Sequence, residues 1–122
     1  MKLTAKKFSI PVSNQDRAVK FYTEKLGFEL VRDTPFGPEQ RWIELRLPGQ
    51  DVELVLFTPD EHKARIGTFQ HVLFTAPDVF KAYEEMKAKG VEFPMPPTKE
   101  PWGVSSVFKD VDGNSFSLAS AD

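Results

Sequence analysis

The sequence predicts an α+β protein made of two copies of one strand–helix–strand–strand–strand unit. Residues 8–30 (FSIPVSNQDRAVKFYTEKLGFEL) recur in altered form at residues 71–93 (HVLFTAPDVFKAYEEMKAKGVEF), with the same order of strand pattern, helix, glycine and second strand. Gly27 and Gly90 stand at matching helix ends. Because each copy is too small to bury its own sheet face, we expect a cup-shaped, eight-stranded mixed sheet with the helices outside.

Alternating apolar and polar residues predict a first strand within residues 4–12. Ser13 and Asp16 resemble a capping box, and the helix that follows extends to about Leu26. Turn residues separate the remaining strands of the first copy, which are expected at 28–34, 41–47 and 51–57. The polar stretch at about 59–67 is the expected linker between units at about 1–58 and 68–122, within a single domain of residues 1–122.

The second copy has a proline-rich interruption. Strands are expected at 69–76, 91–93, 104–108 and 115–119, with a helix from near 77 to 89. Residues 94–103 contain four prolines and are expected to be irregular. The sequence DVDGN at 110–114 predicts a hairpin turn.

Composition excludes several classes of function. The net charge of -2 provides no basic surface, so nucleic acid is not an expected partner. The absence of cysteine excludes disulfides, thiolate nucleophiles and thiolate metal ligands. No apolar run is long enough for a signal peptide or a membrane span, so we expect a cytoplasmic location and no membrane partner.

Four sequence motifs together cover essentially the whole chain. They are 12–14 (VSN) leading to 21–28 (FYTEKLGF), 71–74 (HVLF), 87–93 (KAKGVEF), and 101–103 (PWG) with 110–114 (DVDGN). As a set they resemble the vicinal oxygen chelate superfamily, the glyoxalase, bleomycin-resistance and extradiol-dioxygenase group. Val111 departs from the proline that this family usually has there. The resemblance is specific for fold but weak for reaction, because the fold hosts many chemistries.

The resemblance implies a site for zinc, nickel, manganese or iron, formed by the first and last strand of each copy. Strand periodicity assigns its four positions to Lys7, Glu53, His71 and Ser117, where metal-dependent members usually have His or Gln, Glu, His and Glu. Only Glu53 and His71 can ligate as the family does, since a Lys ammonium has no lone pair. Two ligands fall short of the usual three. We therefore expect a degenerate metal site and no cofactor.

Each of these residues also has a purely structural interpretation. Glu53 and Lys7 can simply neutralise each other, because unpaired buried charges are costly. His71 can be a hydrogen-bonded strand residue without chemistry. His62, in the polar linker, is expected to be a solvated surface residue.

Aromatic side chains are the candidates for a ligand pocket. Trp42 and Trp102 can belong either to the core or to pocket walls, and Phe36 is a similar candidate. Arg41 can bind a carboxylate, although a surface salt bridge is its expected role. The substrate-binding candidates are Lys7, Trp42, Phe57, Trp102 and Ser117.

Two functions from different classes follow from the resemblance. The first is a glyoxalase/bleomycin-resistance/dioxygenase-like protein that binds a small organic molecule in the cup. The alternative is a divalent-metal-dependent lyase, isomerase or dioxygenase acting on a vicinal-oxygen substrate, with the metal as a Lewis acid and Glu53 as the base. A third is metal-independent acid–base catalysis by His71 and Glu53. A homodimer is expected, as in relatives of this size, because the sheet edges need covering.

Overall fold

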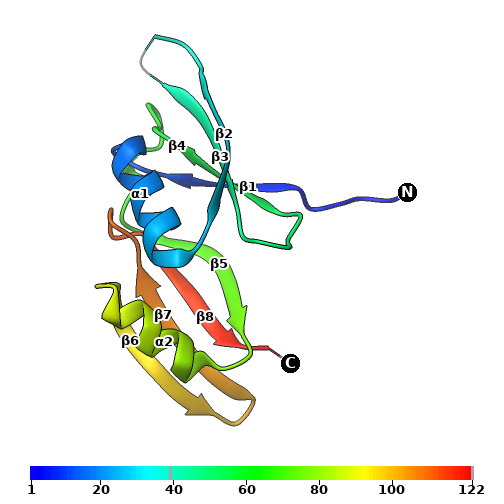
Figure 1. Cartoon of the computed structure of the whole chain (residues 1–122), viewed down its shortest axis with the longest axis vertical. Coiled ribbons are helices and arrows are strands. Elements are labelled where there is room, and N and C mark those ends of the chain that lie inside the picture. The colour runs from blue at the N-terminus through cyan, green and yellow to red at the C-terminus, as the bar shows by residue number, and fades with distance from the viewer. Residues whose placement is uncertain (39, 122) are drawn as a thin grey trace. The chain divides into compact units, whose positions relative to one another are not determined.

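The computed structural model describes residues 1–38 and 40–121 and confirms the α+β class. The chain divides into two compact units, Met1–Ile66 and the residues from Gly67 onward. Each unit has the expected order of strand, helix and three strands (Figure 1). The eight strands form two four-stranded mixed sheets, one in each unit.

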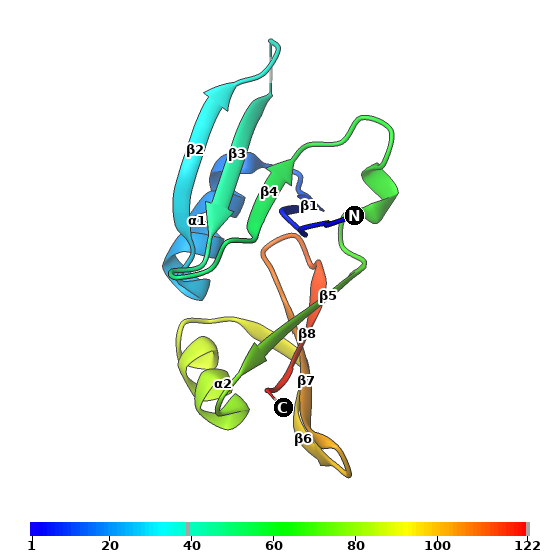
Figure 2. The same cartoon turned by 90° about the vertical axis from the view of Figure 1, so that its right-hand side faces the viewer.

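The first unit contains one helix and four strands. They are β1 (Lys7–Pro11), α1 (Gln15–Leu26), β2 (Glu29–Pro35), β3 (Arg41–Arg46) and β4 (Glu53–Phe57). The sheet order is β1-β4-β3-β2, and Figure 2 shows β2, β3 and β4 side by side. The β1–β4 pair is parallel and the other pairs are antiparallel. A short 3₁₀ helix (Lys63–Arg65) lies in the expected linker.

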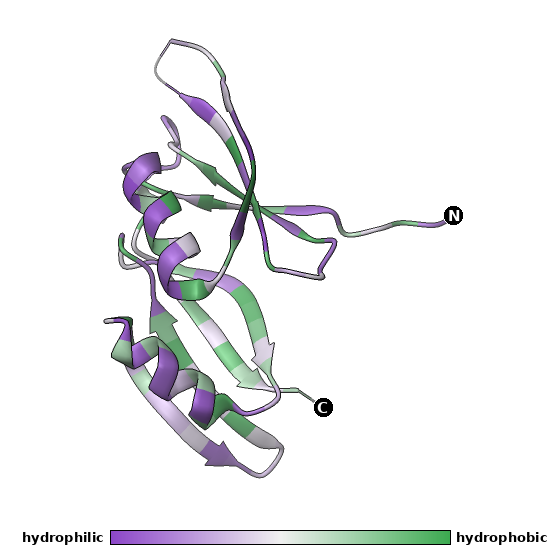
Figure 3. Cartoon of the chain, in the orientation of Figure 1, coloured by the Kyte–Doolittle hydropathy of each residue, from purple (hydrophilic) through white to green (hydrophobic). Residues whose placement is uncertain are grey.

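Helix α1 begins one residue later than the sequence predicted. Its N-cap is Asn14, not Ser13, and the Asn14 side chain accepts a hydrogen bond from the Arg17 N–H at 2.9 Å. Both residue types cap helices well, so the motif alone does not fix the register. The helix ends as predicted at Gly27, which adopts a left-handed conformation with φ 80°. Its bands of polar and apolar residues are visible in Figure 3.

The core of the first unit lies between α1 and its sheet. The fully or nearly fully buried side chains include Ile10, Val12, Ala18, Tyr22, Ile43, Leu45, Leu54 and Leu56. Phe21, Tyr22 and Phe28 pack edge to face with ring centroids 5.5 and 5.6 Å apart, a favoured geometry for aromatic pairs. One face of β1, β3 and β4 is therefore used for the core, and the alternate residues of these strands are left for other roles.

The second unit repeats this order around an aromatic core. Its elements are β5 (Phe69–Ala76), α2 (Val79–Ala88), β6 (Glu92–Glu100), β7 (Gly103–Lys109) and β8 (Ser115–Ser120). The sheet order is β5-β8-β7-β6, with β5 and β8 parallel. The rings of Phe74, Phe108 and Phe116 contact one another at 5.5–5.8 Å. Gly90 follows α2 with φ 90°, so the second predicted glycine stop is also confirmed.

The prediction that residues 94–103 are irregular was wrong. Strand β6 continues through Pro94, Pro96 and Pro97 to Glu100, and the hairpin to β7 follows directly. Proline is tolerated here because β6 is the edge strand of its sheet. The pairing with β7 shifts register twice, between Glu92 and Met95 and between Met95 and Thr98.

The predicted turn at 110–114 is present and is fixed by buried polar groups. Asp110 accepts hydrogen bonds from the backbone N–H groups of Asp112 and Asn114, both at 2.9 Å. The Asn114 amide oxygen, which is fully buried, accepts from the Gly67 N–H at 2.7 Å and from Gln70 Nε2 at 3.0 Å. This network joins the turn to the start of β5.

No helix in the described part of the chain is long and apolar enough to cross a membrane.

Candidate functional site

Strand alternation in the first unit places charged and aromatic side chains on one face of the sheet, opposite to the core side chains. We call this the polar face. Cross-strand pairing puts Lys7 beside Glu53, Ser9 beside Val55, Glu44 beside Val55 and Arg46 beside Glu53. Residues that pair across strands point to the same side of a sheet. The polar face thus carries Lys7 and Ser9 from β1, Trp42, Glu44 and Arg46 from β3, and Glu53, Val55 and Phe57 from β4.

The Lys7 ammonium lies between two buried carboxylates. Its Nζ donates to Glu44 Oε2 at 2.8 Å and to Glu53 Oε1 at 2.9 Å. The Glu44 and Glu53 side chains are 5% and 6% exposed, whereas that of Lys7 is 36% exposed. The ion pair that the sequence suggested between Lys7 and Glu53 is therefore present, and Glu44 is an additional partner. We call these three residues the charge cluster.

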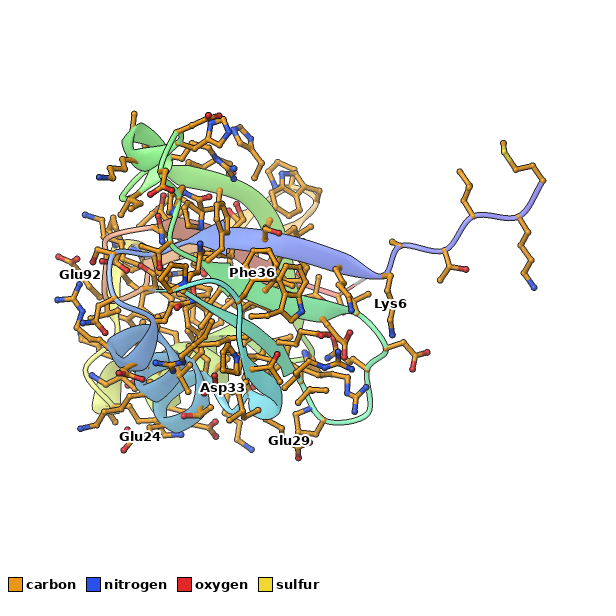
Figure 4. All side chains as sticks on the ribbon, turned by 90° about the horizontal axis from the view of Figure 1, so that it is seen from above. Lys6, Glu24, Glu29, Asp33, Phe36 and Glu92 are labelled. Carbon is orange, nitrogen blue, oxygen red and sulfur yellow. The ribbon has the colours of Figure 1, made fainter. Side chains whose placement is uncertain are left out.

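Three further cations surround the charge cluster. Arg32 Nε lies 3.4 Å from Glu44 Oε1, and Lys6 Nζ lies 3.8 Å from Glu53 Oε1. Arg46 approaches Glu53 Oε2 at 3.8 Å. Figure 4 labels Lys6 where the extended N-terminal segment enters β1. These longer pairs involve more exposed side chains and contribute less than the Lys7 contacts.

Trp42 links the charge cluster to an aromatic pocket. Its indole Nε1 donates to Glu44 Oε1 at 2.9 Å. The hydrogen bond from Lys7, followed by the smaller effect of Trp42, lowers the Glu44 pKa from its ordinary 4.5 to about 2. The hydrogen bonds that Lys7 donates to Glu44 and Glu53 raise its pKa above the usual value. At neutral pH Lys7 is thus a protonated ammonium and Glu44 is ionised.

A cavity of about 450 Å³ lies next to the cluster on the same face. Its walls include Ser9, Trp42, Val55 and Phe57 from the strands and Phe36 from the β2–β3 loop. The rings of Phe36 and Trp42 are 6.2 Å apart, and Figure 4 labels Phe36 among the side chains. Asp60, Glu61 and His62 line the cavity from the segment after β4, and His62 is exposed as expected. This arrangement of aromatic walls with a few polar groups is typical of small-molecule pockets.

Arg41 lines the cavity but is committed to structural contacts. Its guanidinium binds Asp16 at 2.7 Å and Asp33 at 2.9 Å, and these carboxylates raise its pKa. Its backbone N–H and C=O are held by the side chain of Gln15, at 3.1 and 2.6 Å. The surface salt bridge expected for Arg41 is therefore observed, and its charge is already neutralised.

His71 lies in an irregular part of β5. In the β5–β8 pairing, Phe69 pairs with Ser115 and the next pair is Leu73 with Ser117. An advance of four residues along β5 is therefore matched by an advance of two along β8. Within this bulge His71 adopts φ 57°, a left-handed conformation uncommon for a residue other than glycine, and its side chain is exposed. Its ring packs on the edge of Phe69 at 4.8 Å. Bulges and strained residues occur often at functional positions.

The remaining candidates lie elsewhere in the second unit. Ser117 is half-buried on β8 and pairs with Leu73 and Val107. Trp102 lies in the β6–β7 hairpin and is 65% exposed, so it is not a core residue. Of the predicted site residues, the structure brings four onto the polar face of the first unit: Lys7, Glu53, Trp42 and Phe57.

Sequence reasoning missed Glu44. The signal was available, because Trp42, Glu44 and Arg46 alternate with the buried residues Ile43 and Leu45. This period of two places all three on the face that carries Glu53. The resemblance implied a site on the first and last strand of each copy, whereas β3 is the third strand of the first copy.

A divalent metal does not fit the first-unit residues. The Lys7 ammonium holds the position between Glu44 and Glu53, where it would repel a metal cation, and both carboxylates are paired already. Among residues 1–38 and 40–121, no three His, Asp or Glu side chains are grouped so that they could hold an ion. No chemical step through a metal follows from this arrangement.

The family model described as Glyoxalase/Bleomycin resistance protein/Dioxygenase superfamily matches residues 4–118. The chain belongs to this superfamily. Relatives include the "Uncharacterized protein YurT" of Bacillus subtilis (strain 168), 40% identical over 90% of this chain and 93% of that protein. A "Probable lactoylglutathione lyase, chloroplastic" of Arabidopsis thaliana is 32% identical over 88% of this chain, which spans 33% of that relative.

Solved structures agree with the family assignment. A superfamily member from Sphaerobacter thermophilus DSM 20745 has a TM-score of 0.89 and 30% identity, with 98% of each chain covered. TnmS3, described as an antibiotic binding protein from Streptomyces sp. CB03234, has a TM-score of 0.82 and 31% identity, covering 99% of this chain and 98% of its own.

Proposed function

We propose that this protein binds a small organic molecule on the polar face of its first unit, without a metal. The observation that carries this proposal is the position of Lys7, whose ammonium bridges Glu44 and Glu53 at 2.8 and 2.9 Å. The chain itself thus supplies the cation that neutralises these carboxylates, which a metal would otherwise need as ligands. The degenerate metal site expected from the sequence is part of this proposal.

The adjoining cavity supports binding of an apolar ligand. Phe36, Trp42 and Phe57 supply three aromatic walls, and the volume of about 450 Å³ lies in the range of small-molecule sites. TnmS3, at 31% identity, is described as an antibiotic binding protein, so ligand binding has a precedent among similar chains. In this proposal Lys7, Trp42 and Phe57 contact the ligand, whereas participation by Trp102 and Ser117 stays a prediction.

A metal-dependent lyase, isomerase or dioxygenase is the second candidate. The strained, exposed His71 favours it, as does the Arabidopsis relative named as a probable lactoylglutathione lyase. In that case Glu53 and His71 would be the metal ligands, with Glu53 as base. Acid–base catalysis by the same two residues without a metal is the third candidate.

Calorimetry separates binding from metal chemistry. Zinc, nickel and manganese chlorides should bind the unmodified protein weakly or not at all, and 1-anilinonaphthalene-8-sulfonate should bind and quench Trp42 fluorescence. Lys7→His combined with Ser117→Glu should raise metal affinity by orders of magnitude, because a like charge is removed and two ligand groups are gained. Tight stoichiometric metal binding by the unmodified protein, lost in Glu53→Ala and His71→Ala, would instead establish the enzyme candidate.

We also propose a homodimer, as in relatives of similar size, and a cytoplasmic location stays a prediction from the sequence. In the first unit β1 and β2 are edge strands that pairing between chains would cover. Light scattering at micromolar concentration should give twice the mass of 13.9 kDa. A monomer mass under these conditions would refute the dimer.

A further inference from the structure

On each of three strands, a residue that lines the aromatic cavity lies two positions from a residue of the charge cluster. Ser9, Val55 and Trp42 line the cavity, and each is two residues from Lys7, Glu53 and Glu44 respectively. Two residues along a strand span about 7 Å, a distance that a fused two-ring aromatic body bridges. A ligand lying against Trp42 and Val55 therefore reaches the charge cluster with one end.

The Lys7 ammonium uses two of its three N–H donors in hydrogen bonds to the described residues. An ammonium carries three N–H donors, and among the described residues the partners of Lys7 Nζ are Glu44 and Glu53 alone. The two carboxylates are 5% and 6% exposed, whereas the Lys7 side chain is 36% exposed. The accessible side chain of the cluster is thus that of Lys7.

The surrounding charges favour an acceptor that carries negative charge. Lys6, Arg32 and Arg46 join Lys7 around the cluster. The opposing carboxylates are the buried Glu44 and Glu53 together with Glu29, which pairs with Arg46 across β2 and β3. Among the described residues, the four cations Lys6, Lys7, Arg32 and Arg46 outnumber the two carboxylates with which they pair. At the other end of the cavity Asp60 and Glu61 would repel an anion.

Building on the proposed function, we infer that the ligand is a flat aromatic compound bearing a carboxylate, with its rings against Trp42 and its carboxylate on the third N–H of Lys7. Arg41, the other cation at the cavity, is paired with Asp16 and Asp33. Lys7 acts here as a built-in cation. It neutralises two buried carboxylates and presents one donor to the ligand, so recognition of the oxygen requires no metal.

Three naphthalene probes test this inference on the unmodified protein. 2-Naphthoate should bind more tightly than 2-methylnaphthalene, and 2-naphthylmethylamine should bind most weakly, as measured by quenching of Trp fluorescence. A hydrogen bond to a charged partner corresponds to roughly a 10- to 100-fold preference for the carboxylate. Equal or tighter binding of the amine would overturn the inference. If none of the three probes binds, the proposed function fails together with it.

Two variants locate the preference. Lys7→Met combined with Glu44→Gln removes the donor without changing the net charge of the cluster, and should bind 2-naphthoate no better than 2-methylnaphthalene. Lys6→Met removes a neighbouring, 58% exposed cation that lies 3.8 Å from Glu53, and should keep the preference within about threefold. A preference that survives the double substitution, or that Lys6→Met abolishes equally, would overturn the role of Lys7. Because the probe series is measured on the unmodified protein, the inference stays testable even if the double variant does not fold.

Discussion

The two units share one order of elements but differ in what their sheets carry. In the first unit β1 and β4 pair in five consecutive steps, which places Lys7 directly beside Glu53. In the second unit the matching strands, β5 and β8, are interrupted at His71, and the next pair is Leu73 with Ser117. Charged groups are thus fixed in one copy, whereas the other has His71 and Ser117 at the positions predicted to match Lys7 and Glu53. The repeat provides the scaffold, and a few side chains give the first copy the charge cluster and the cavity of the proposed binding site.

The buried polar groups of the units also differ in kind. The first unit buries the Glu44 and Glu53 side chains against Lys7. The second buries Asp110 and Asn114 at the two ends of a turn, and the Asn114 amide joins backbone and side-chain donors. Removing one partner should therefore leave a buried charge without its counter-ion in the first unit. In the second unit it should leave buried hydrogen-bonding groups without that partner. The following substitutions test this difference, in order of decreasing effect.

Asn114→Ala should be the most damaging. It leaves the Gly67 N–H, Gln70 Nε2 and Asp110 Oδ2 without their Asn114 partner, and each lost bond at a buried group is unfavourable. We expect the free energy of unfolding, measured by urea denaturation, to fall by about 3 kcal/mol. Asn14→Ala, which removes the exposed cap of α1, is the matched control and should lower it by about 1 kcal/mol. Equal losses in the two variants would contradict a special role for the turn.

Lys7→Met should follow. Two buried carboxylates then lack their common cation, so we expect a loss of stability at pH 7 that is smaller than in Asn114→Ala but clearly larger than in Lys6→Met. Lys6→Met, at the adjacent and more exposed position, should change the free energy of unfolding by less than about 0.5 kcal/mol. Urea denaturation of both variants in the same buffer makes the comparison. Similar values would mean that the charge cluster does not hold the first sheet together.

Acidification should weaken the first unit through Glu44. Its folded pKa of about 2 lies below its ordinary 4.5, so the stabilisation is complete above pH 4.5 and is lost as the pH falls toward 2. Between pH 6 and pH 3 the free energy of unfolding should fall by about 1–2 kcal/mol more in the unmodified protein than in Glu44→Gln. Parallel pH profiles would refute this assignment. Hydrogen exchange should locate the additional opening in β1, β3 and β4.

Gly27→Ala should have the smallest effect. The residue has φ 80°, and a Cβ there meets no atom within 4 Å, so only backbone strain opposes the change. We expect a loss of about 1 kcal/mol in thermal denaturation. Gly27→Asn should lose less, because asparagine tolerates the left-handed conformation. A larger loss for asparagine would point to steric crowding rather than strain.

Local patterns in the sequence were sufficient for the order of elements and for both glycine stops. Period-two alternation also placed Lys7 and Glu53 on one face, since a strand fixes which side each residue points to. Glu44 was within reach of the same argument. The bulge at His71 was not, because it depends on how many residues of β5 are matched to β8, and no local pattern states that number.

Prolines misled the sequence analysis for a physical reason. Their missing N–H excludes them from the interior of a sheet but not from its edge, and sequence alone does not say which strand is outermost. Similarly, Ser13 and Asn14 are both competent caps, so tertiary packing of α1 decides between them. Propensity describes what a residue tolerates, and the neighbours select among the tolerated options.

The prolines of β6 also affect how this molecule meets other chains. Within residues 94–97 three of four positions have no backbone donor, and this strand is at the outer edge of its sheet. A foreign strand that approaches this edge finds few N–H groups with which to continue the ladder. The same feature that lets the edge pair irregularly with β7 thus protects the second unit from growing into an extended intermolecular sheet at high concentration.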